Sequence, residues 1–316
     1  MKYAKDTRPE GAPTDSAEIL VEALPWIKNI TGKTVVIKYG GSAMVDEQLR
    51  ADVMSDIVLM KIVGVNPVVV HGGGKAITEA MAQRDLPVEF KDGQRVTTPE
   101  AMDVVRTVLM GKVNQELVEA LNRHGNFAVG VSGADAGVIV AEQASPDLGR
   151  VGRITRINRP LLDDLVAADY IPVIASVALG EDGGFYNVNA DMVAGHIAAA
   201  IGTHKAVFLT DVDGLYEDFS DKGSLISQMT VSETKQMLAE GKVSSGMIPK
   251  LQSCIEAIEG GVPRAHIVNG TKPHSILVEL LTSSGAGTLI YDDDAEFSKD
   301  EMRPLGILAS RLSENL

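Results

Sequence analysis

The chain has 316 residues, of which 45% are hydrophobic, so it can bury one large core or two moderate ones. Its net charge is −14, from 29 basic and 43 acidic residues, and no run rich in Lys or Arg occurs. Because nucleic-acid binding needs a basic face, this composition excludes a nucleic-acid partner. In so acidic a chain, the lysines and arginines within glycine-rich segments are where we expect an anionic ligand to bind.

The cysteine count and the hydropathy pattern restrict the protein further. Cys254 is the single cysteine, which excludes an intrachain disulfide and a Cys-based metal site, and its apolar register predicts a buried residue. Residues 1–16 are polar and lack the apolar core of a signal peptide. No run approaches the ~18 apolar residues that a membrane span needs. We therefore expect a cytoplasmic protein with no membrane partner.

The first predicted element is an amphipathic helix near the N-terminus. Its apolar stripe consists of Ile19, Leu20, Ala23, Leu24 and Ile27. Pro25 should kink this helix, because proline lacks the N–H that a helix interior uses. A helix outside the main core must bury its stripe either on its own chain or on a partner, and the stripe alone leaves both open.

From about Lys33, short β-branched runs alternate with amphipathic helical stretches, which predicts an α/β fold with a mainly parallel sheet. The apolar character of the runs is typical of strands covered on both faces; they are 34–37, 67–70, 171–174, 206–209 and 265–268. One long helix stripe contains Met102, Val105, Leu109, Val113, Leu117 and Leu121. Residues 86–98 and 137–158 break the alternation, and we expect hairpins or loops there that shape a substrate pocket.

Two glycine-rich turns follow consecutive predicted strands. The first carries Lys38, Gly40 and Gly41, and the second carries Gly72 to Gly74. Glycines let the backbone approach a phosphate, and the helix that follows offers free N–H groups. Neither a Walker A loop nor a dinucleotide fingerprint fits the second turn. One such turn could be an ordinary strand-to-helix connection, but two in succession are typical of a polyphosphate cradle.

The segment NVNAD begins a predicted helix. Asn189 can cap that helix and Asp191 suits its first turn, so both have a structural explanation. Asn187 has none, and two asparagines aimed at one place indicate recognition of an amide or a carboxylate.

Two later segments also predict charged groups at strand or helix ends. A strand ends in Thr210, Asp211, Asp213 and Gly214, which fits either a Mg²⁺ or nucleotide site or an ordinary turn. In residues 244–251, Pro249 suits a first helical turn, so Lys250 would stand among unpaired N–H groups. A lysine at the positive end of a helix dipole is unfavourable unless an anion shares the site.

Taken in this order, these segments resemble the amino acid kinase superfamily and, within it, the N-acetylglutamate kinases. The similarity covers residues 18 to about 291. The matching stretches are EALPWIKNITGKTVVIKYGG, VVVHGGG, GQRVTTPEAMDVVRTVLMGKVN, GVSGADAG, NVNAD, LTDVDGLY, GMIPK and SGAGTLI. Each is weakly specific alone, but GQRVT together with NVNAD separates this family from the uridylate, carbamate, aspartate and glutamate 5-kinases.

The resemblance implies a three-layer αβα sandwich, the amino acid kinase fold, preceded by the kinked helix. It implies an N-terminal extension at 1–32, a lobe at 33–203 for acetylglutamate and dimerisation, a lobe at 204–294 for ATP, and a tail at 295–316. The implied reaction is ATP- and Mg²⁺-dependent phosphorylation of the side-chain carboxylate of N-acetyl-L-glutamate. The alternatives are another acid kinase of the same fold, such as glutamate 5-kinase or aspartate kinase, and a non-catalytic arginine sensor.

The resemblance also implies the site residues. The catalytic group would be Lys38 and Lys250, which bind the transferring phosphoryl group, and Asp191, which orients them. Substrate would be bound by Gly73, Gly74, Arg95, Asn187 and Asn189. ATP would lie near Gly40, Gly41, Thr210, Asp211, Asp213, Gly214 and Leu215, and no protein metal ligand is predicted.

Family members with the N-terminal helix are hexamers, trimers of dimers, that L-arginine inhibits. The implied arginine site contains Trp26, where tyrosine is more usual, with Glu279, Gly285 and Gly287 in the matching C-terminal region. A PII-type signalling protein is a further partner that the resemblance leaves open.

Overall fold

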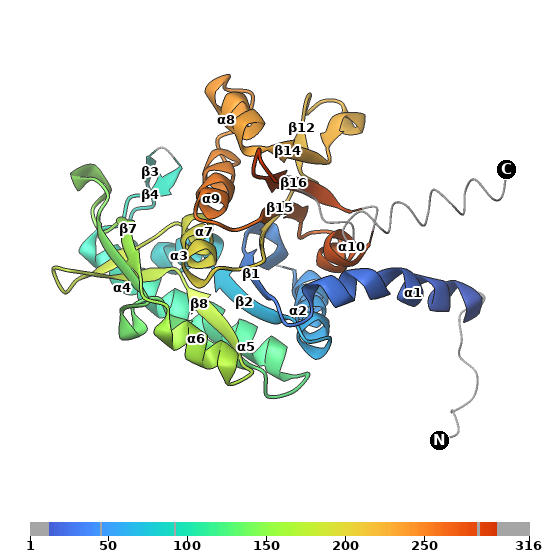
Figure 1. Cartoon of the computed structure of the whole chain (residues 1–316). Coiled ribbons are helices and arrows are strands. Elements are labelled where there is room, and N and C mark those ends of the chain that lie inside the picture. The colour runs from blue at the N-terminus through green and yellow to red at the C-terminus, as the bar shows by residue number, and fades with distance from the viewer. Residues whose placement is uncertain (1–12, 45, 92, 283–284, 296–316) are drawn as a thin grey trace.

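The computed structural model describes residues 13–44, 46–91, 93–282 and 285–295. Its framework is an eight-stranded sheet in the order β14-β16-β15-β11-β1-β2-β8-β5 (Figure 1). All neighbouring strands are parallel except β15 and β16. The strands are β1 (Thr34–Tyr39), β2 (Asn66–His71), β5 (Ala128–Ser132), β8 (Ile171–Ala175), β11 (Lys205–Thr210), β14 (Gln228–Thr230), β15 (Arg264–Asn269) and β16 (Gly287–Tyr291). The five predicted strands are confirmed.

Helices cover both faces of the sheet, so the predicted three-layer sandwich is confirmed. One face packs against α2 (Glu47–Ile62), α3 (Gly74–Ala82), α4 (Pro99–Val108), α5 (Gln115–Asn122) and α10 (Ser275–Leu281). The other packs against α6 (Pro160–Ala167), α7 (Ala190–Ile201), α8 (Val231–Ala239) and α9 (Ile248–Glu259). Alternate residues of β1 enter the two cores, because successive side chains of a strand point to opposite faces.

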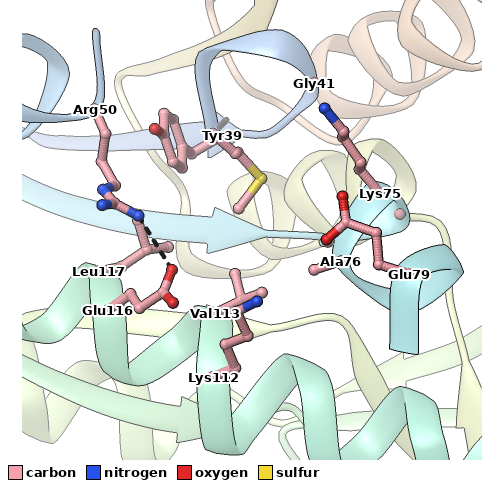
Figure 2. A pocket seen from close by; sticks show the side chains of 13 residues that line it. Tyr39, Gly41, Arg50, Lys75, Ala76, Glu79, Lys112, Val113, Glu116 and Leu117 are labelled. Carbon is pink, nitrogen blue, oxygen red and sulfur yellow. Dashed lines mark hydrogen bonds and ion pairs between the residues drawn. The ribbon is translucent and has the colours of Figure 1, made fainter. Parts of the chain in front are cut away.

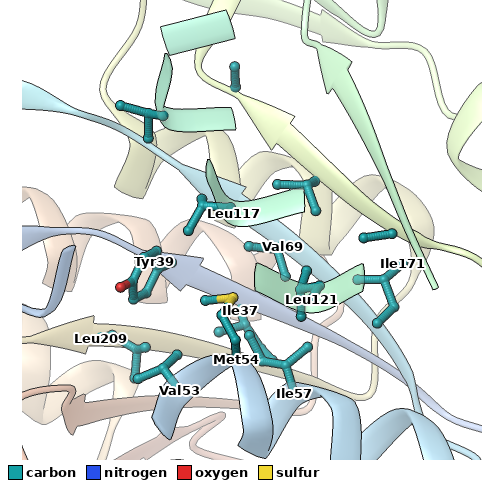
Figure 3. Packing of buried hydrophobic residues seen from close by; sticks show 14 of the residues in the cluster. Ile37, Tyr39, Val53, Met54, Ile57, Val69, Leu117, Leu121, Ile171 and Leu209 are labelled. Carbon is teal, nitrogen blue, oxygen red and sulfur yellow. The ribbon is translucent and has the colours of Figure 1, made fainter. Parts of the chain in front are cut away.

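The long stripe predicted as one helix is buried, but a π-helical turn, η2 (Leu109–Asn114), lies between α4 and α5. Figure 3 shows Leu117 and Leu121 packed in the core that also contains Ile37 of β1 and Met54 of α2. Periodicity predicted the buried face, whereas a single widened turn leaves no mark in that pattern.

The two irregular regions form hairpins, as predicted. The first pairs β3 (Phe90–Lys91) with β4 (Gln94–Arg95), and the second pairs β6 (Ile139–Gln143) with β7 (Gly152–Ile157). The second hairpin joins β9 (Val177–Gly180) and β10 (Phe185–Asn187) in a four-stranded sheet, β10-β9-β6-β7. The remaining short elements are β12 (Leu215–Tyr216), β13 (Leu225–Ile226), η1 (Gly41–Met44), η3 (Asp135–Gly137), η4 (Pro146–Leu148) and η5 (Lys222–Ser224).

The N-terminal helix α1 (Pro13–Ile30) continues as one element through Pro25, and the kink expected there stays a prediction. Its last turns pack on the core, with Ala23, Trp26 and Ile27 partly buried, and α1 contacts α10. Its first described turns extend away from the sheet (Figure 1) and leave three residues of the apolar stripe, Ile19, Leu20 and Leu24, 61–71% exposed, together with the neighbouring Val21. The stripe is therefore only half covered by its own chain.

Other predictions have mixed outcomes. Cys254 is fully buried on α9, as expected. No helix within the described ranges is long and apolar enough to cross a membrane. Strands from both sides of residue 203 share one sheet, and the lobe boundary there stays a prediction. Most of the tail, 296–316, and residues 1–12 of the N-terminal extension lie outside the described residues.

Candidate active site

The carboxyl ends of adjacent parallel strands bring the predicted segments to one edge of the sheet. Lys38 of β1 is in register with Val70 of β2 and with Phe208 of β11. The glycine turns after β1 and β2 are therefore neighbours, and residues 210–215 follow the strand on the other side. In open α/β sheets, ligands bind at this edge.

Two lysines converge there on one buried carboxylate. Lys38 Nζ lies 2.9 Å from Asp191 Oδ1, and Lys250 Nζ donates to Asp191 Oδ2 at 3.3 Å. The side chains of Lys38, Asp191 and Lys250 are 8%, 7% and 16% exposed. Burial works to raise the pKa of Asp191, but the charges of the two lysines and their hydrogen bonds outweigh it and lower that pKa. The three formal charges therefore sum to +1, and the side chains that carry them are largely buried.

Local sequence explains how the three side chains meet. Asn189 Oδ1 accepts from the N–H groups of Asp191 and Met192, which caps α7 as predicted. Helix α9 starts at Ile248 without a side-chain cap, so Lys250 stands in its first turn. A Cβ at Gly195 would lie 2.7 Å from the carbonyl oxygen of Ser253, so only glycine lets α7 cross α9 this closely. The positive ends of two helix dipoles are thus added to the two lysines.

A cavity of about 230 Å³ opens beside this group. Its wall includes most of the predicted substrate and phosphate residues: Lys38, Gly40, Gly41, Gly73, Gly74, Arg95, Asn187, Asn189 and Asp191. Lys250 is not one of the residues that form this wall, but it contacts Asp191, which is. Residues from β1, the hairpin β3–β4, α3 and the start of α7 are therefore brought together, although more than 150 positions separate the first from the last in the chain.

The polar side chains of the cavity are held by neighbours. Arg95 is only 7% exposed, and its Nη2 donates to Gly74 O at 2.9 Å and to Thr78 Oγ1 at 2.6 Å. Its guanidinium also lies 4.7 Å from the centre of the Phe90 ring. Asn187 Nδ2 donates to Thr97 Oγ1 at 3.2 Å. These contacts fix a planar cation and an amide at the cavity wall, which suits a carboxylate and an amide of a small ligand.

The segment after β11 forms a separate polar cluster on the same edge. Asp213 Oδ1 accepts from Asn269 Nδ2 and from Lys272 Nζ, each at 2.7 Å. The hydrogen bonds from Lys272 and Asn269 lower the pKa of Asp213.

Gly214 has no room for a side chain, since a Cβ there would lie 2.5 Å from Thr288 Oγ1, and Leu215 is buried in β12. Thr210 Oγ1 donates to Asp211 at 3.3 Å. Within the described ranges, no group of three or more His, Cys, Asp or Glu side chains is placed to hold a metal ion.

Comparison with known proteins assigns the fold to a family. The model of the amino acid kinase family matches residues 33–269. The chain belongs to the amino acid kinase family. An acetylglutamate kinase from Bifidobacterium longum is 50% identical over 287 residues, which covers 88% of this chain and 93% of that protein. An acetylglutamate kinase from Halothermothrix orenii is 49% identical over 284 residues and is covered to 98%.

Solved structures agree on the fold. An N-acetylglutamate synthase from Neisseria gonorrhoeae, solved with coenzyme A and N-acetyl-glutamate, superposes with a TM-score of 0.78 at 24% identity. The match covers 95% of this chain and 70% of that one. At this identity the likeness shows the amino acid kinase fold alone.

The residues predicted to bind arginine lie elsewhere in this amino acid kinase. Glu279 of α10 accepts from the N–H groups of Ala286 and Gly287 at 2.6 and 2.9 Å, and its other oxygen lies 2.6 Å from His266 Nδ1. Gly285 has φ +62°, a conformation that glycine favours. The structure thus brings Glu279, Gly285 and Gly287 together. Trp26 of α1 is partly buried, and its Nε1 has no hydrogen-bond partner among the described residues.

Sequence reasoning missed a larger cavity, of about 700 Å³, on the other side of the glycine turns. Figure 2 shows Arg50 of α2 paired with Glu116 of α5 at 3.1 Å on one wall, and Lys75 and Glu79 of α3 on another. Lys75 is exposed. The cavity shares Gly41, Gly73 and Gly74 with the smaller one. No single motif could have revealed it, because its walls come from separate helices.

Proposed function

We propose that the protein transfers the γ-phosphoryl group of ATP to the side-chain carboxylate of N-acetyl-L-glutamate, the first phosphorylated step of an arginine-biosynthetic route. The observation that carries this proposal is the pair of ammonium groups, from Lys38 and Lys250, on opposite oxygens of Asp191 beside a small polar cavity. Relatives about 50% identical over nearly the whole chain are acetylglutamate kinases, which supports the choice of substrate.

The chemistry is governed by charge. A glutamate side-chain carboxylate has a reference pKa of ~4.3, so it is ionised at neutral pH and needs no general base. A carboxylate oxygen forms a bond to the γ-phosphorus while the bond to the β–γ bridging oxygen breaks, and ADP leaves with that electron pair. Two anions must approach each other, and Lys38, Lys250 and the helix N-termini neutralise the phosphoryl oxygens. Asp191 keeps the two ammonium groups at a fixed separation.

The cavity wall supplies substrate recognition. Arg95 would clamp the α-carboxylate of the substrate, and Asn187 and Asn189 would contact its polar groups. The N–H groups of Gly73 and Gly74 would donate to the substrate and to the transferring phosphoryl group. The N-terminal lobe at 33–203 would thereby hold acetylglutamate, and the lobe at 204–294 would hold the nucleotide.

The nucleotide would lie over the edge after β11, at Thr210, Asp211, Asp213, Gly214 and Leu215, with its phosphates toward Gly40 and Gly41. When bound, Mg²⁺ neutralises charge on the phosphate oxygens. Both oxygens of Asp191 face lysines and Asp213 already accepts from Lys272 and Asn269, so we propose that the ion enters on the phosphates of ATP.

A coupled assay for ADP release tests the activity. We expect turnover with N-acetyl-L-glutamate, and at least about a hundredfold lower kcat/KM with free glutamate and with aspartate, since polar groups built for an absent substrate group are left unpaired. Preference for free glutamate or aspartate would identify a different acid kinase. Absence of ATP consumption with any acid would favour the alternative, an arginine sensor without turnover.

We further propose a cytoplasmic homohexamer, a trimer of dimers, inhibited by L-arginine. The exposed apolar stripe of α1 needs a partner, and a second copy of α1 offers a matching one. Trp26, Glu279, Gly285 and Gly287 would form the arginine site, and a PII-type protein would be an additional partner of the hexamer. Light scattering should give six times the chain mass of 33.5 kDa. A dimer, or activity indifferent to millimolar arginine, would contradict this assembly.

A further inference from the structure

Behind the glycine turn of the substrate cavity lie two buried side chains that do not line it. His71 ends β2 and Asn114 ends the π-helical turn η2, and both have 0% of their surface exposed. We propose that His71 and Asn114 are positioning residues, a hydrogen-bonded relay that fixes the Gly72–Gly74 turn for phosphoryl transfer. This inference rests on the kinase activity proposed above.

The contacts determine where each proton of the relay lies. His71 Nδ1 is 3.0 Å from the carbonyl oxygen of Gly72, and a carbonyl can only accept, so Nδ1 carries the proton. Nε2 is then an acceptor, and Asn114 Nδ2 lies 3.0 Å from it. The same amide nitrogen donates to the carbonyl oxygen of Val173 at 2.8 Å, which fixes the orientation of the amide. The imidazole is thus locked in one tautomer, and burial lowers the pKa of His71 to about 4, so the ring is neutral at neutral pH.

The side-chain amide of Asn114 is buried although one of its polar atoms is left without a hydrogen bond. Asn114 Oδ1 is buried and has no hydrogen-bond partner in the described part of the chain, which leaves the cost of its desolvation unrecovered. A Cβ at Gly130 of β5 would lie 2.0 Å from Asn114 Oδ1, so that strand must carry a glycine here. An apolar residue at position 114 would avoid the unpaired oxygen. Packing alone therefore does not explain the asparagine.

The π-helical turn explains how the amide reaches the histidine. A π turn joins residue i to residue i+5, which brings Asn114 closer to the face of the helix that carries Leu109. Leu109 and Val113 pack against the turn itself, since a Cβ at Gly73 would lie 2.8 and 3.2 Å from their methyl groups. The same widened turn thus supplies both the apolar contact and the polar anchor of the glycines.

The relay and Arg95 together hold the glycine turn at both ends. His71 donates to the carbonyl of Gly72 from the core side, and Arg95 Nη2 donates to the carbonyl of Gly74 at 2.9 Å from the cavity side. With both carbonyls fixed, the N–H groups at the start of α3, which have no partner within the helix, are set in advance for a phosphoryl oxygen. The relay acts on the transition state through the backbone and does not touch the substrate.

Two substitutions of similar size test separately the contact of His71 with Gly72 and its contact with Asn114. In His71→Asn the side-chain amide occupies the place of Nδ1 and can still donate to Gly72, whereas in His71→Gln it occupies the place of Nε2 and keeps only the contact with Asn114. We expect His71→Gln to lower kcat by on the order of tenfold more than His71→Asn does, since a small displacement of a catalytic donor can cost about a hundredfold. The KM for N-acetyl-L-glutamate should change less than about threefold in both, because Arg95 and Asn187 remain.

Thermal melts and an NMR readout keep the test independent of folding and of the activity itself. Both variants should melt at similar temperatures, so equal kcat values in the two would overturn the relay. Wild-type turnover decides the proposed function separately. In long-range ¹H–¹⁵N spectra of the wild-type protein, His71 should show the Nδ1–H tautomer, and Asn114→Leu should release it. An Nε2–H tautomer in the wild type would overturn the relay even if the enzyme proved inactive on every acid tested.

Discussion

Replacing Asp191 with asparagine tests the electrostatic core of the site. The change keeps the shape of the side chain and removes one negative charge between two ammonium groups at 2.9 and 3.3 Å. At an effective dielectric constant of about 20, each contact supplies about 5–6 kcal/mol of gross Coulomb attraction. Much of this is offset by the cost of burying three charges.

The net loss follows from what remains in Asp191→Asn. Two lysines that are 8% and 16% exposed would face each other without a counter-charge. Removing one partner of a buried ion pair typically costs 3–5 kcal/mol, so we expect the free energy of unfolding to fall by about that amount. Because the pKa of Asp191 is lowered in the fold, its contribution is fully present above the unfolded pKa of ~3.9 and disappears as the pH falls through the folded value. The difference between wild type and variant should therefore be constant from pH 6 to 8 and narrow only in acid.

Urea denaturation followed by circular dichroism measures this loss, and ADP release measures kcat, which we expect to fall about a hundredfold because the lysines are no longer oriented. The matched control is Asp163→Asn, which breaks the exposed pair with Arg159 at 2.6 Å and should leave the urea midpoint and kcat unchanged. If Asp191→Asn unfolds at the same urea concentration as wild type, the carboxylate does not make the contribution to stability that its contacts with the two lysines predict.

Three further predictions address individual groups. Lys38→Ala and Lys250→Ala should each lower kcat by roughly a hundred- to thousandfold, and near-normal turnover in either would remove that lysine from the mechanism. Arg95→Lys should raise the KM for N-acetyl-L-glutamate about 10- to 100-fold, because an ammonium cannot reproduce the planar guanidinium; an unchanged KM would refute the carboxylate clamp. His274 donates to Asp56 at 2.6 Å; this hydrogen bond raises the pKa of His274, while burial raises the pKa of Asp56 to about 6. The raised pKa of His274 means that its protonated ring stabilises the fold, and this contribution is lost as the pH rises through the folded pKa. The melting temperature of wild type should therefore exceed that of His274→Asn by more at pH 6.5 than at pH 8.5. An equal difference at both pH values would exclude this linkage.

The fold was largely predictable from the sequence because its signals are local. The five apolar runs are long, β-branched and separated by helical stripes, and each became a strand of the central sheet. Asn189 was predictable as a cap, since capping depends on residues two and three positions away. The interruption at η2 was not predictable, because a π turn keeps its apolar residues buried and changes only which polar residue faces inward.

The residues of the site likewise include some that could be predicted from the sequence and some that could not. The residues implied by resemblance, Lys38, Arg95, Asn187 and Asp191, do lie around one cavity, although their roles remain proposals. The roles of His71 and Asn114 could not be predicted, since the contact between them spans 43 positions and depends on a glycine in a third segment.

Lys250 shows where a physical anomaly in a sequence becomes informative. A lysine in the first turn of a helix predicts a nearby anion, but the sequence cannot say which one, because the answer depends on how closely α7 crosses α9. The structure supplies a carboxylate that is already shared with Lys38, and one negative charge cannot satisfy two ammonium groups and two helix N-termini. A surplus of positive charge therefore persists at this edge of an otherwise acidic protein. A dianionic phosphoryl group that is being transferred from ATP to a carboxylate would neutralise this positive charge. The neutralisation is most complete in the transition state, where the charge of the phosphoryl group is spread over three oxygens.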